Sequence, residues 1–321
     1  MLKIFKQLEK IWQGSLFRLN NKTQQALVSK NELLDLLLQV KSNKKTDKYK
    51  NEVAFKQAGD IRSIYRGYGM DYEESRRYQP GDDPRYMNWQ LSARTGQHYM
   101  KVFREERQLG VFILVDRRHS MRFGTRKRLK ITQAVRAAAI ATFSAQENNY
   151  SIGGVILDDN IEWFKESKSK QAAFNFINQA ARPISPSYKK KSSESGFGDI
   201  LRMLNEILTS GSIVYLISDF HDLNEKSQST LLQLSSSHQI RAIQISDLAE
   251  IDLPKAGNVT LKDSIFGVRQ QLNSNSLHQQ EKYKVAAKEY FSVKKSLFKD
   301  IVIPHQTILT TDDYINEKII F

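Results

Sequence analysis

The chain has 321 residues, of which 40% are hydrophobic, and it contains no cysteine. This composition supports a folded core and excludes wholesale disorder, disulfides, thiolate metal sites and a cysteine nucleophile. The net charge of +14 suits nucleic acid or anionic lipid, and equally a solvated basic surface. There is no zinc-finger or ribonucleoprotein motif, no long apolar run and no cleavable signal pattern. We therefore expect a cytoplasmic protein and do not expect nucleic acid as its partner.

Residues 1–50 are predicted to form an N-terminal helical segment that ends in a charged linker at 41–48. Apolar residues recur between lysines at helical spacing: Phe5, Leu8, Trp12 and Leu16. Such a basic amphipathic helix either packs on its own protein or lies on a membrane surface. Peripheral contact with the inner membrane through this helix therefore remains an alternative.

Residues 51–106 form a second predicted segment, rich in Tyr, Arg and Gly, with strand patterns near 61–65 and 98–103. Between the strands lies a run of turn formers with one tryptophan: Pro80, Gly81, Asp82, Asp83, Pro84, Arg85, Asn88 and Trp89. Proline fixes φ, glycine accepts positive φ, and the aspartates can cap backbone amides or pair with nearby arginines. We expect a rigid loop that braces the N-terminal segment against the core, or a second contact surface.

From residue 107 to the C-terminus, strand and helix patterns alternate, and four short apolar runs each end at an aspartate: Asp116, Asp158, Asp219 and Asp247. Short continuous apolar runs are typical of parallel strands buried on both faces. The carboxyl ends of such strands share one edge of the sheet, where ligands bind. Each aspartate can also be an ordinary turn former or helix N-cap. The predicted fold is α/β, a doubly wound, mostly parallel sheet of Rossmann type, with an N-terminal helical and β-rich appendage.

The loop at 116–121 is the first candidate for chemistry. Asp116 and Ser120 offer oxygen ligands of the kind that Mg²⁺ prefers, whereas Arg118 would repel a cation or stand in for one. His221 follows Asp219 at the same predicted edge, but a lone edge histidine is more often a surface residue. We find no hydrolase elbow, zinc-protease motif or P-loop, and an aspartate-nucleophile phosphatase would need Asp at position 118. A metal-dependent phosphohydrolase therefore remains only an alternative function.

Six stretches together carry a family resemblance: residues 78–89, 92–94, 101–106, 115–121, 217–220 and 253–257. On these residues the chain, from about residue 55 onward, closely resembles the bacterial DUF58 family. The resemblance implies a von Willebrand factor A-like domain at 107–321. It also implies a non-enzymatic scaffold that acts with a MoxR-type AAA+ ATPase in assembling or maturing other proteins, which the sequence does not identify. Binding to nucleic acid or an anionic membrane surface is the other alternative.

A von Willebrand A domain binds partners at a metal-ion-dependent adhesion site, made of Asp-x-Ser-x-Ser, a threonine from a second loop and an aspartate from a third. In this chain Asp116, Ser120 and Asp219 match that pattern, Arg118 replaces the first serine, and Gly198 stands in the place of the threonine. The resemblance thus implies a degenerate, partner-binding adhesion site formed by these five residues. We expect no cofactor and no tight Mg²⁺; if a metal did bind, Asp116, Ser120 and Asp219 would be its ligands.

Overall fold

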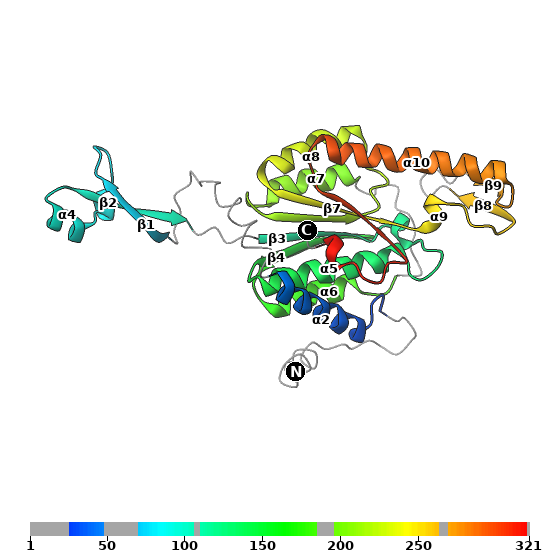
Figure 1. The fold of residues 1–321 in the computed structure, drawn as a ribbon, viewed down its shortest axis with the longest axis horizontal. Helices are drawn as coiled ribbons and strands as arrows, with labels where there is room; N and C mark the ends of the chain where they lie inside the picture. The colour runs from blue at the N-terminus through cyan, green and yellow to red at the C-terminus, as the bar shows by residue number, and fades with distance from the viewer. Residues whose placement is uncertain (1–25, 48–69, 106–109, 185–195, 263–268, 320–321) are drawn as a thin grey trace. The chain divides into compact units, whose positions relative to one another are not determined.

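A computed structural model of the chain describes residues 26–47, 70–105, 110–184, 196–262 and 269–319 (Figure 1). By its internal contacts the chain divides into two compact units, a smaller one of residues 44–108 and a larger one of the rest. Among the described helices, none is both long and apolar enough to cross a membrane. The predicted helix with Trp12 and the predicted strand at 61–65 lie outside the described residues.

The larger unit is built on a six-stranded sheet with the strand order β10–β7–β6–β3–β4–β5. All neighbouring strands are parallel except β4 and β5. The strands are β3 Gly110–Asp116, β4 Ser151–Leu157, β5 Ile161–Ser167, β6 Ile213–Ser218, β7 Gln239–Ser246 and β10 His305–Leu309. The chain runs outward from β3 to β5 and then returns to place β6 on the other side of β3. The strand order therefore reverses between β3 and β6, which is where open α/β sheets form their ligand crevice.

Helices cover both faces of this sheet (Figure 1). One face carries α2 Lys30–Asp47, α5 Lys130–Glu147, α6 Lys170–Ala180 and α11 Asn316–Ile319. The other face carries α7 Phe197–Ile207, α8 Glu225–Ser237 and α10 Leu277–Asp300. The predicted doubly wound α/β architecture is therefore confirmed, because the strands are buried on both faces as their uninterrupted apolar runs indicated.

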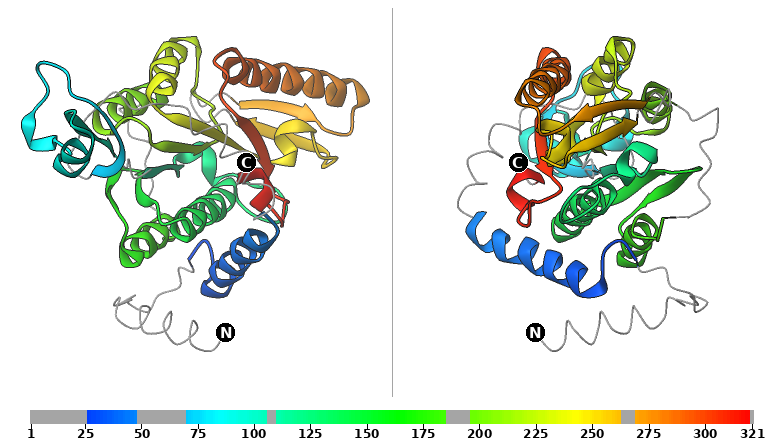
Figure 2. Two further views of the ribbon diagram at one scale, coloured as in Figure 1. Left: turned by 60° about the vertical axis from the view of Figure 1, so that its left-hand side comes forward. Right: turned by 90° about the vertical axis from the view of Figure 1, so that its right-hand side faces the viewer.

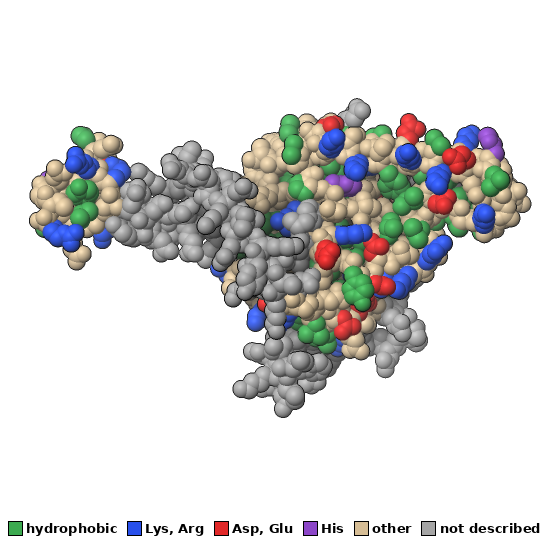
Figure 3. Space-filling model, in the orientation of Figure 1, with side chains coloured by type: hydrophobic (Ala, Val, Ile, Leu, Met, Phe, Trp, Pro, Cys, Tyr) green, Lys and Arg blue, Asp and Glu red, His purple; other side chains and the backbone are tan. Residues whose placement is uncertain are grey.

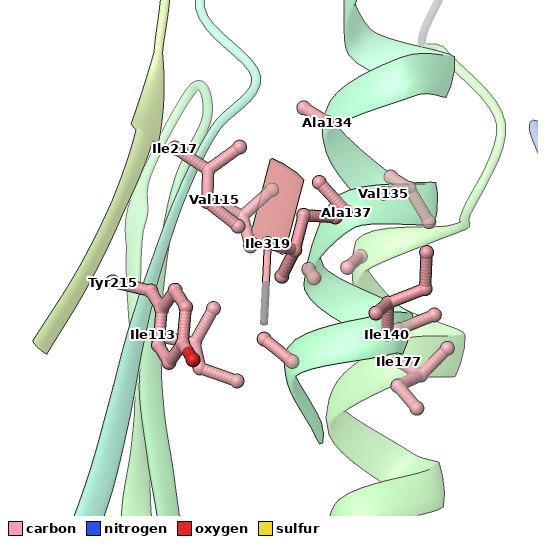
Figure 4. Close-up of a cluster of buried hydrophobic side chains, with 14 of the residues drawn as sticks. Ile113, Val115, Ala134, Val135, Ala137, Ile140, Ile177, Tyr215, Ile217 and Ile319 are labelled. Atoms are coloured by element: carbon pink, nitrogen blue, oxygen red, sulfur yellow. The ribbon is translucent and has the colours of Figure 1, made fainter. Parts of the chain in front are cut away.

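The first core layer lies between the sheet and α5 (Figure 4). Ile113 and Val115 of β3 point toward this helix, while Phe112 and Leu114 alternate to the opposite face. Most of α5 is buried, and it presents a run of small residues, which allows it to approach the sheet closely. The helix begins at Lys130, whose backbone amide donates to the Phe123 carbonyl and closes the preceding loop.

The second core layer contains three phenylalanines that pack edge to face. The ring of Phe220 lies 5.4 Å from that of Phe197 on α7 and 4.9 Å from that of Phe298 on α10, centroid to centroid. Phe220 is fully buried and adopts φ 53°, a left-handed conformation that is uncommon for a bulky residue. Its buried ring is thus held between two helices in a loop whose backbone is strained.

The α2 helix packs on the larger unit. Val28, Leu33 and Leu36 join its core, and the Glu32 carboxylate pairs with Arg136 of α5 at 2.9 Å. The predicted linker at 41–48 is helical as far as Asp47. Residues 26–43 belong with the α/β unit. Charged residues alone indicated a linker, but lysines are also good helix formers.

A short extension follows β7. It consists of α9 Leu248–Ile251 and a hairpin of β8 Asn258–Lys262 and β9 Arg269–Asn273. The N-terminal half of α10 runs alongside this hairpin (Figure 2). The side chain of Gln280 on α10 donates to the Ser274 carbonyl, which fixes the start of the helix against the end of the hairpin.

The smaller unit is an antiparallel hairpin with a long structured connection. It contains β1 Met70–Arg77, the 3₁₀ turn η1 Pro84–Tyr86, α4 Trp89–Thr95 and β2 Tyr99–Glu105. Asp82 accepts from the Gln79 amide and pairs with Arg76, and Asp83 caps η1 while pairing with Arg85. Both aspartates therefore make the amide caps and arginine pairs that their turn chemistry predicted.

Candidate functional site

The four aspartates predicted at the sheet edge lie there. Asp116 ends β3, and the other three directly follow the parallel strands β4, β6 and β7. Parallel strands in one sheet bring their carboxyl ends to the same edge, so these side chains are gathered along it. Their surroundings differ, however, and the differences decide what each can do.

The Asp116 carboxylate is fully buried and closed by hydrogen bonds. Its Oδ1 accepts from the backbone amide of Arg118 at 2.9 Å and from the Arg118 Nε at 3.1 Å. Its Oδ2 accepts from the Arg118 Nη2 at 2.8 Å and from the Ser218 hydroxyl at 2.7 Å. Four donors already engage its oxygens, so Asp116 has little capacity left to bind another group.

Arg118 joins two loops that come from opposite sides of the topological switch. Its Nη1 and Nη2 also contact the two carboxylate oxygens of Asp222, at 2.7 and 3.0 Å. Burial opposes the charge on this guanidinium, but Asp116 and Asp222 outweigh burial and raise the pKa of Arg118. The same pairing overcomes burial at Asp222 and lowers the pKa of its carboxyl group. Two acidic groups therefore share one permanent cation.

Asp222 also reaches the second loop predicted to contribute. Its Oδ2 accepts from the backbone amide of Phe197, at the start of α7, at 2.9 Å. Gly198 faces α8, because a Cβ built on it would lie 3.1 Å from the Ser227 hydroxyl of that helix. The second loop thus contributes the backbone amide of Phe197. It contributes no side chain from position 198. Asp199 lies in the first turn of α7, and its carboxylate accepts from the Gly196 amide.

Asp219 is held by a lysine and a histidine. Lys130 Nζ lies 2.8 Å from its Oδ2 and 2.5 Å from Glu250, and His221 Nδ1 lies 3.5 Å from its Oδ1. Burial alone would raise the pKa of Asp219, but Lys130 and His221 hold it well below its usual range. The two carboxylates in turn outweigh the burial of Lys130 and raise its pKa.

Ser120 and His221 come together, which their sequence separation did not predict. The Ser120 hydroxyl lies 3.3 Å from His221 Nδ1. This nitrogen also faces Asp219 and Asp222, so serine and carboxylates compete for the same ring atom. A catalytic Ser–His–Asp relay needs the serine and the acid on opposite ring nitrogens. The arrangement is therefore not that of a serine hydrolase.

The remaining two aspartates are structural. Asp158 receives three arginines, Arg117, Arg122 and Arg182, each at 2.7–2.9 Å. Arg117 is fully buried and also donates to the carbonyls of Ala180 and Arg182, which ties the end of α6 to β4. Asp247 caps α9 and accepts from the hydroxyls of two threonines, Thr125 and Thr310. For Asp247 the alternative interpretation, an ordinary N-cap, is the better one.

The residues at this edge do not fit a divalent cation. The guanidinium of Arg118 occupies the space between the carboxylates of Asp116 and Asp222 and bonds both. Mg²⁺ needs free carboxylate and hydroxyl oxygens in octahedral array, and a fixed positive charge repels it. Among the described residues, no group of three His, Asp or Glu side chains is arranged to hold a metal ion.

Sequence reasoning missed three side chains that organise the edge: Lys130, Asp222 and Lys294. Lys294 on α10 is buried and donates to the carbonyls of Leu223 and His221, which holds the loop after β6. Asp222 could have been suspected, because Asp219 to Asp222 carries three polar residues in four after a buried strand. The lysines lie on helices distant in sequence, and no local pattern marks them.

A family match covers most of the chain. The model of the family described as "Protein of unknown function DUF58" matches residues 74–291. The chain belongs to the DUF58 family. This DUF58 chain is 28% identical over 216 residues to uncharacterized proteins Rv1480 of Mycobacterium tuberculosis and Mb1516 of Mycobacterium bovis. The match covers 65% of this chain and 65% of each relative, so the chain spans just under two thirds of their length.

Two solved structures resemble the DUF58 chain distantly. They are BatB from Bacteroides thetaiotaomicron, 11% identical with a TM-score of 0.39, and an aerotolerance-related membrane protein from Bacteroides fragilis, 14% identical with a TM-score of 0.39. The first match covers 63% of this chain and 91% of BatB, and the second 65% and 94%.

Proposed function

We propose that this chain is a non-enzymatic protein-interaction module with a von Willebrand factor A-like domain. It would act with a MoxR-type AAA+ ATPase in assembling or maturing other proteins. Partners would dock at the carboxyl edge of the sheet, on the loops after β3 and β6. Asp116, Ser120 and Asp219 support the domain assignment by their positions at that edge, and the family membership supports the partnership.

One observation carries the proposal: the charged groups of the edge are paired with one another. Asp116, Arg118 and Asp222 form a closed cluster in which Asp116 and Arg118 are buried and Asp222 is half-buried, and Asp219 is paired with Lys130. A hydrolase needs a nucleophile or base whose lone pairs are free to meet a substrate. Fully paired groups instead make a rigid, preorganised surface, which favours docking because little order must be gained on binding.

A binding experiment with edge variants tests the proposal. Phe123 is exposed on the loop after β3, and its ring lies 6.0 Å from the Lys130 ammonium. We expect the purified chain to bind the MoxR-type ATPase encoded in its own genome. Phe123→Glu should weaken binding by about tenfold or more, because an exposed aromatic side chain at the centre of an interface contributes most to affinity.

Val302→Glu is the matched control, since Val302 is an exposed apolar residue at the amino-terminal edge of the sheet, before β10. This variant should bind as the wild type does. Absence of any complex with the ATPase would contradict the partnership, and equal weakening by both variants would contradict the docking edge. Turnover of a small substrate that depends on Asp116 would overturn the non-enzymatic assignment.

A further inference from the structure

The tip of the smaller unit, residues 75–101, exposes three aromatic rings of one chemical kind. Trp89 is 65% exposed, Tyr86 38% and Tyr78 36%. Among the described side chains of this stretch, no Leu, Ile, Val or Met is exposed: Leu91 and Met87 are half-buried and Met100 is buried. The large apolar side chains exposed here are thus rings that carry a polar atom, the kind enriched where membrane meets water.

The same stretch is basic. It holds five Lys or Arg against two Asp, and both aspartates are already paired, Asp82 with Arg76 and Asp83 with Arg85. Three more cations are exposed: Arg77, Arg94 and Lys101. On the smaller unit, Lys and Arg side chains surround hydrophobic ones (Figure 3). An anionic surface would therefore meet several exposed positive charges around the aromatic rings.

The backbone brings these groups together. Arg77 pairs in register with Tyr99 and Ser75 pairs with Lys101, and residues two apart on a strand share a face, so Arg77 and Lys101 stand on one face of the hairpin. Asn88 reaches the Ser75 hydroxyl on that face at 2.9 Å. The next residue, Trp89, begins the helix that also carries Arg94.

The tip is rigid without a large core. The Asn88 side chain caps α4, Gly96 ends it at φ 71°, and the Ser92 hydroxyl accepts from the Tyr99 amide at 2.9 Å. A loop with so many internal hydrogen bonds holds its exposed tryptophan in place. The conformational entropy lost on docking is correspondingly small.

We infer that the tip formed by residues 75–101 docks on an anionic lipid surface, with Trp89, Tyr86 and Tyr78 at the level of the headgroups and Arg77, Arg94 and Lys101 against their phosphates. A lipid surface offers many equivalent anionic groups and needs no pocket in the protein. This fits dispersed cations around amphipathic rings on the connection of a hairpin. The inference goes beyond the proposed function and does not depend on it.

Vesicle co-sedimentation of the full chain tests the inference. We expect binding at low salt to vesicles of phosphatidylcholine with phosphatidylglycerol and none to phosphatidylcholine alone, because the cations drive the first contact. Trp89→Ala and the double change Arg77→Glu with Arg94→Glu should each reduce the partition coefficient by about tenfold or more. Circular dichroism should show unchanged secondary structure, since these side chains are exposed.

Three matched controls separate this surface from others. Lys284→Glu with Lys288→Glu changes the net charge equally on the exposed side of α10, and Tyr314→Ala removes an exposed ring from the larger unit. Both should bind as the wild type does. Lys3→Glu with Lys6→Glu tests the N-terminal segment, and loss of binding there with Trp89→Ala unaffected would overturn the inference. Failure of the wild-type protein to bind anionic vesicles would also overturn it. So would binding of single-stranded nucleic acid or an acidic protein through Trp89 without any binding of lipid.

Discussion

At the scale of single residues, Arg118 decides the character of the sheet edge. Its guanidinium contacts Asp116 and Asp222 through both ends of the fork, and all three groups are largely removed from water. Buried ion pairs add little to stability compared with apolar replacements, but removing one partner leaves the other charges buried and unpaired. Arg118 is therefore better understood as the group that holds two loops together than as a source of net stability.

Replacing Arg118 with methionine should lower the free energy of unfolding by about 3–5 kcal/mol, because two carboxylates would be left facing each other without a cation. Urea denaturation measures the change. Arg202→Met is the control: Arg202 also pairs with an aspartate, Asp199, but both side chains are exposed. That variant should differ from the wild type by less than about 1 kcal/mol. Similar losses for the two variants would contradict the assigned role of Arg118.

Titration with divalent cations is a second test of the cluster formed by Asp116, Arg118 and Asp222. Calorimetric titration of the wild type with Mg²⁺ or Mn²⁺ should reveal no tight, stoichiometric site, because Arg118 fills the space between the carboxylates. In Arg118→Ser that space is free and bordered by Asp116 and Asp222, so added Mn²⁺ should raise the melting temperature of the variant alone. Tight binding by the wild type would show that the site is open.

His221 gives the edge a dependence on pH. Burial alone would lower its pKa, but the hydrogen bond and charge of Asp219, with the charge of Asp222, raise the pKa of His221 above its ordinary value. A raised folded-state pKa contributes stability that is fully present below about pH 6.5 and is lost as pH rises through the folded-state pKa. The stability difference between wild type and His221→Asn should follow that course in denaturation curves recorded across pH. His278→Asn, at an exposed position of α10, should show no such trend.

At the scale of elements, the smaller unit depends on capping more than on burial. Among its described side chains only Ser92 and Met100 are buried, so hydrogen bonds define the position of α4. The side-chain Oδ1 of Asn88 accepts from the Leu91 backbone amide at 3.2 Å, and the side-chain Nδ2 of Asn88 donates to the Ser75 hydroxyl. One side chain thus starts the helix and attaches it to β1.

Asn88→Ala should destabilise α4 by about 1 kcal/mol, the usual cost of losing an N-cap. Hydrogen exchange at the amides of residues 91–95 should become faster accordingly, while exchange in β3 and β6 stays unchanged. Asn88→Asp keeps the accepting oxygen but loses the donor to Ser75, so it should protect the first turn of α4 almost as well. Exchange that is no faster in Asn88→Ala would mean that the cap does not hold the helix.

At the scale of the whole molecule, the sheet was predictable and the pairing of charges was not. Runs such as Val111–Val115 are apolar at every position, a pattern that buried parallel strands produce directly. The alternation of these strands with helices then leads to the double winding. Arg118 lies two residues from Asp116, so their contact was within reach of sequence reasoning.

The partners of Asp219 and Arg118 depend on how distant elements cross. Lys130 and Asp219 are 89 residues apart, and Arg118 and Asp222 are 104 residues apart. The packing of α2 on the larger unit could not be predicted for a similar reason. An apolar stripe indicates that a helix is buried, but it does not indicate which element the helix packs against. The arginine at position 118 and the glycine at position 198 were visible in the sequence, whereas the pairing of Arg118 with both Asp116 and Asp222 required the structure.

The row of rings through Phe197, Phe220 and Phe298 has a mechanical consequence. The central ring belongs to the loop after β6, and its neighbours belong to α7 and α10. Tightly packed interiors do not deform by small continuous amounts; they switch between discrete arrangements. A force applied to that loop would therefore either leave α7 and α10 in place or move the loop and both helices together.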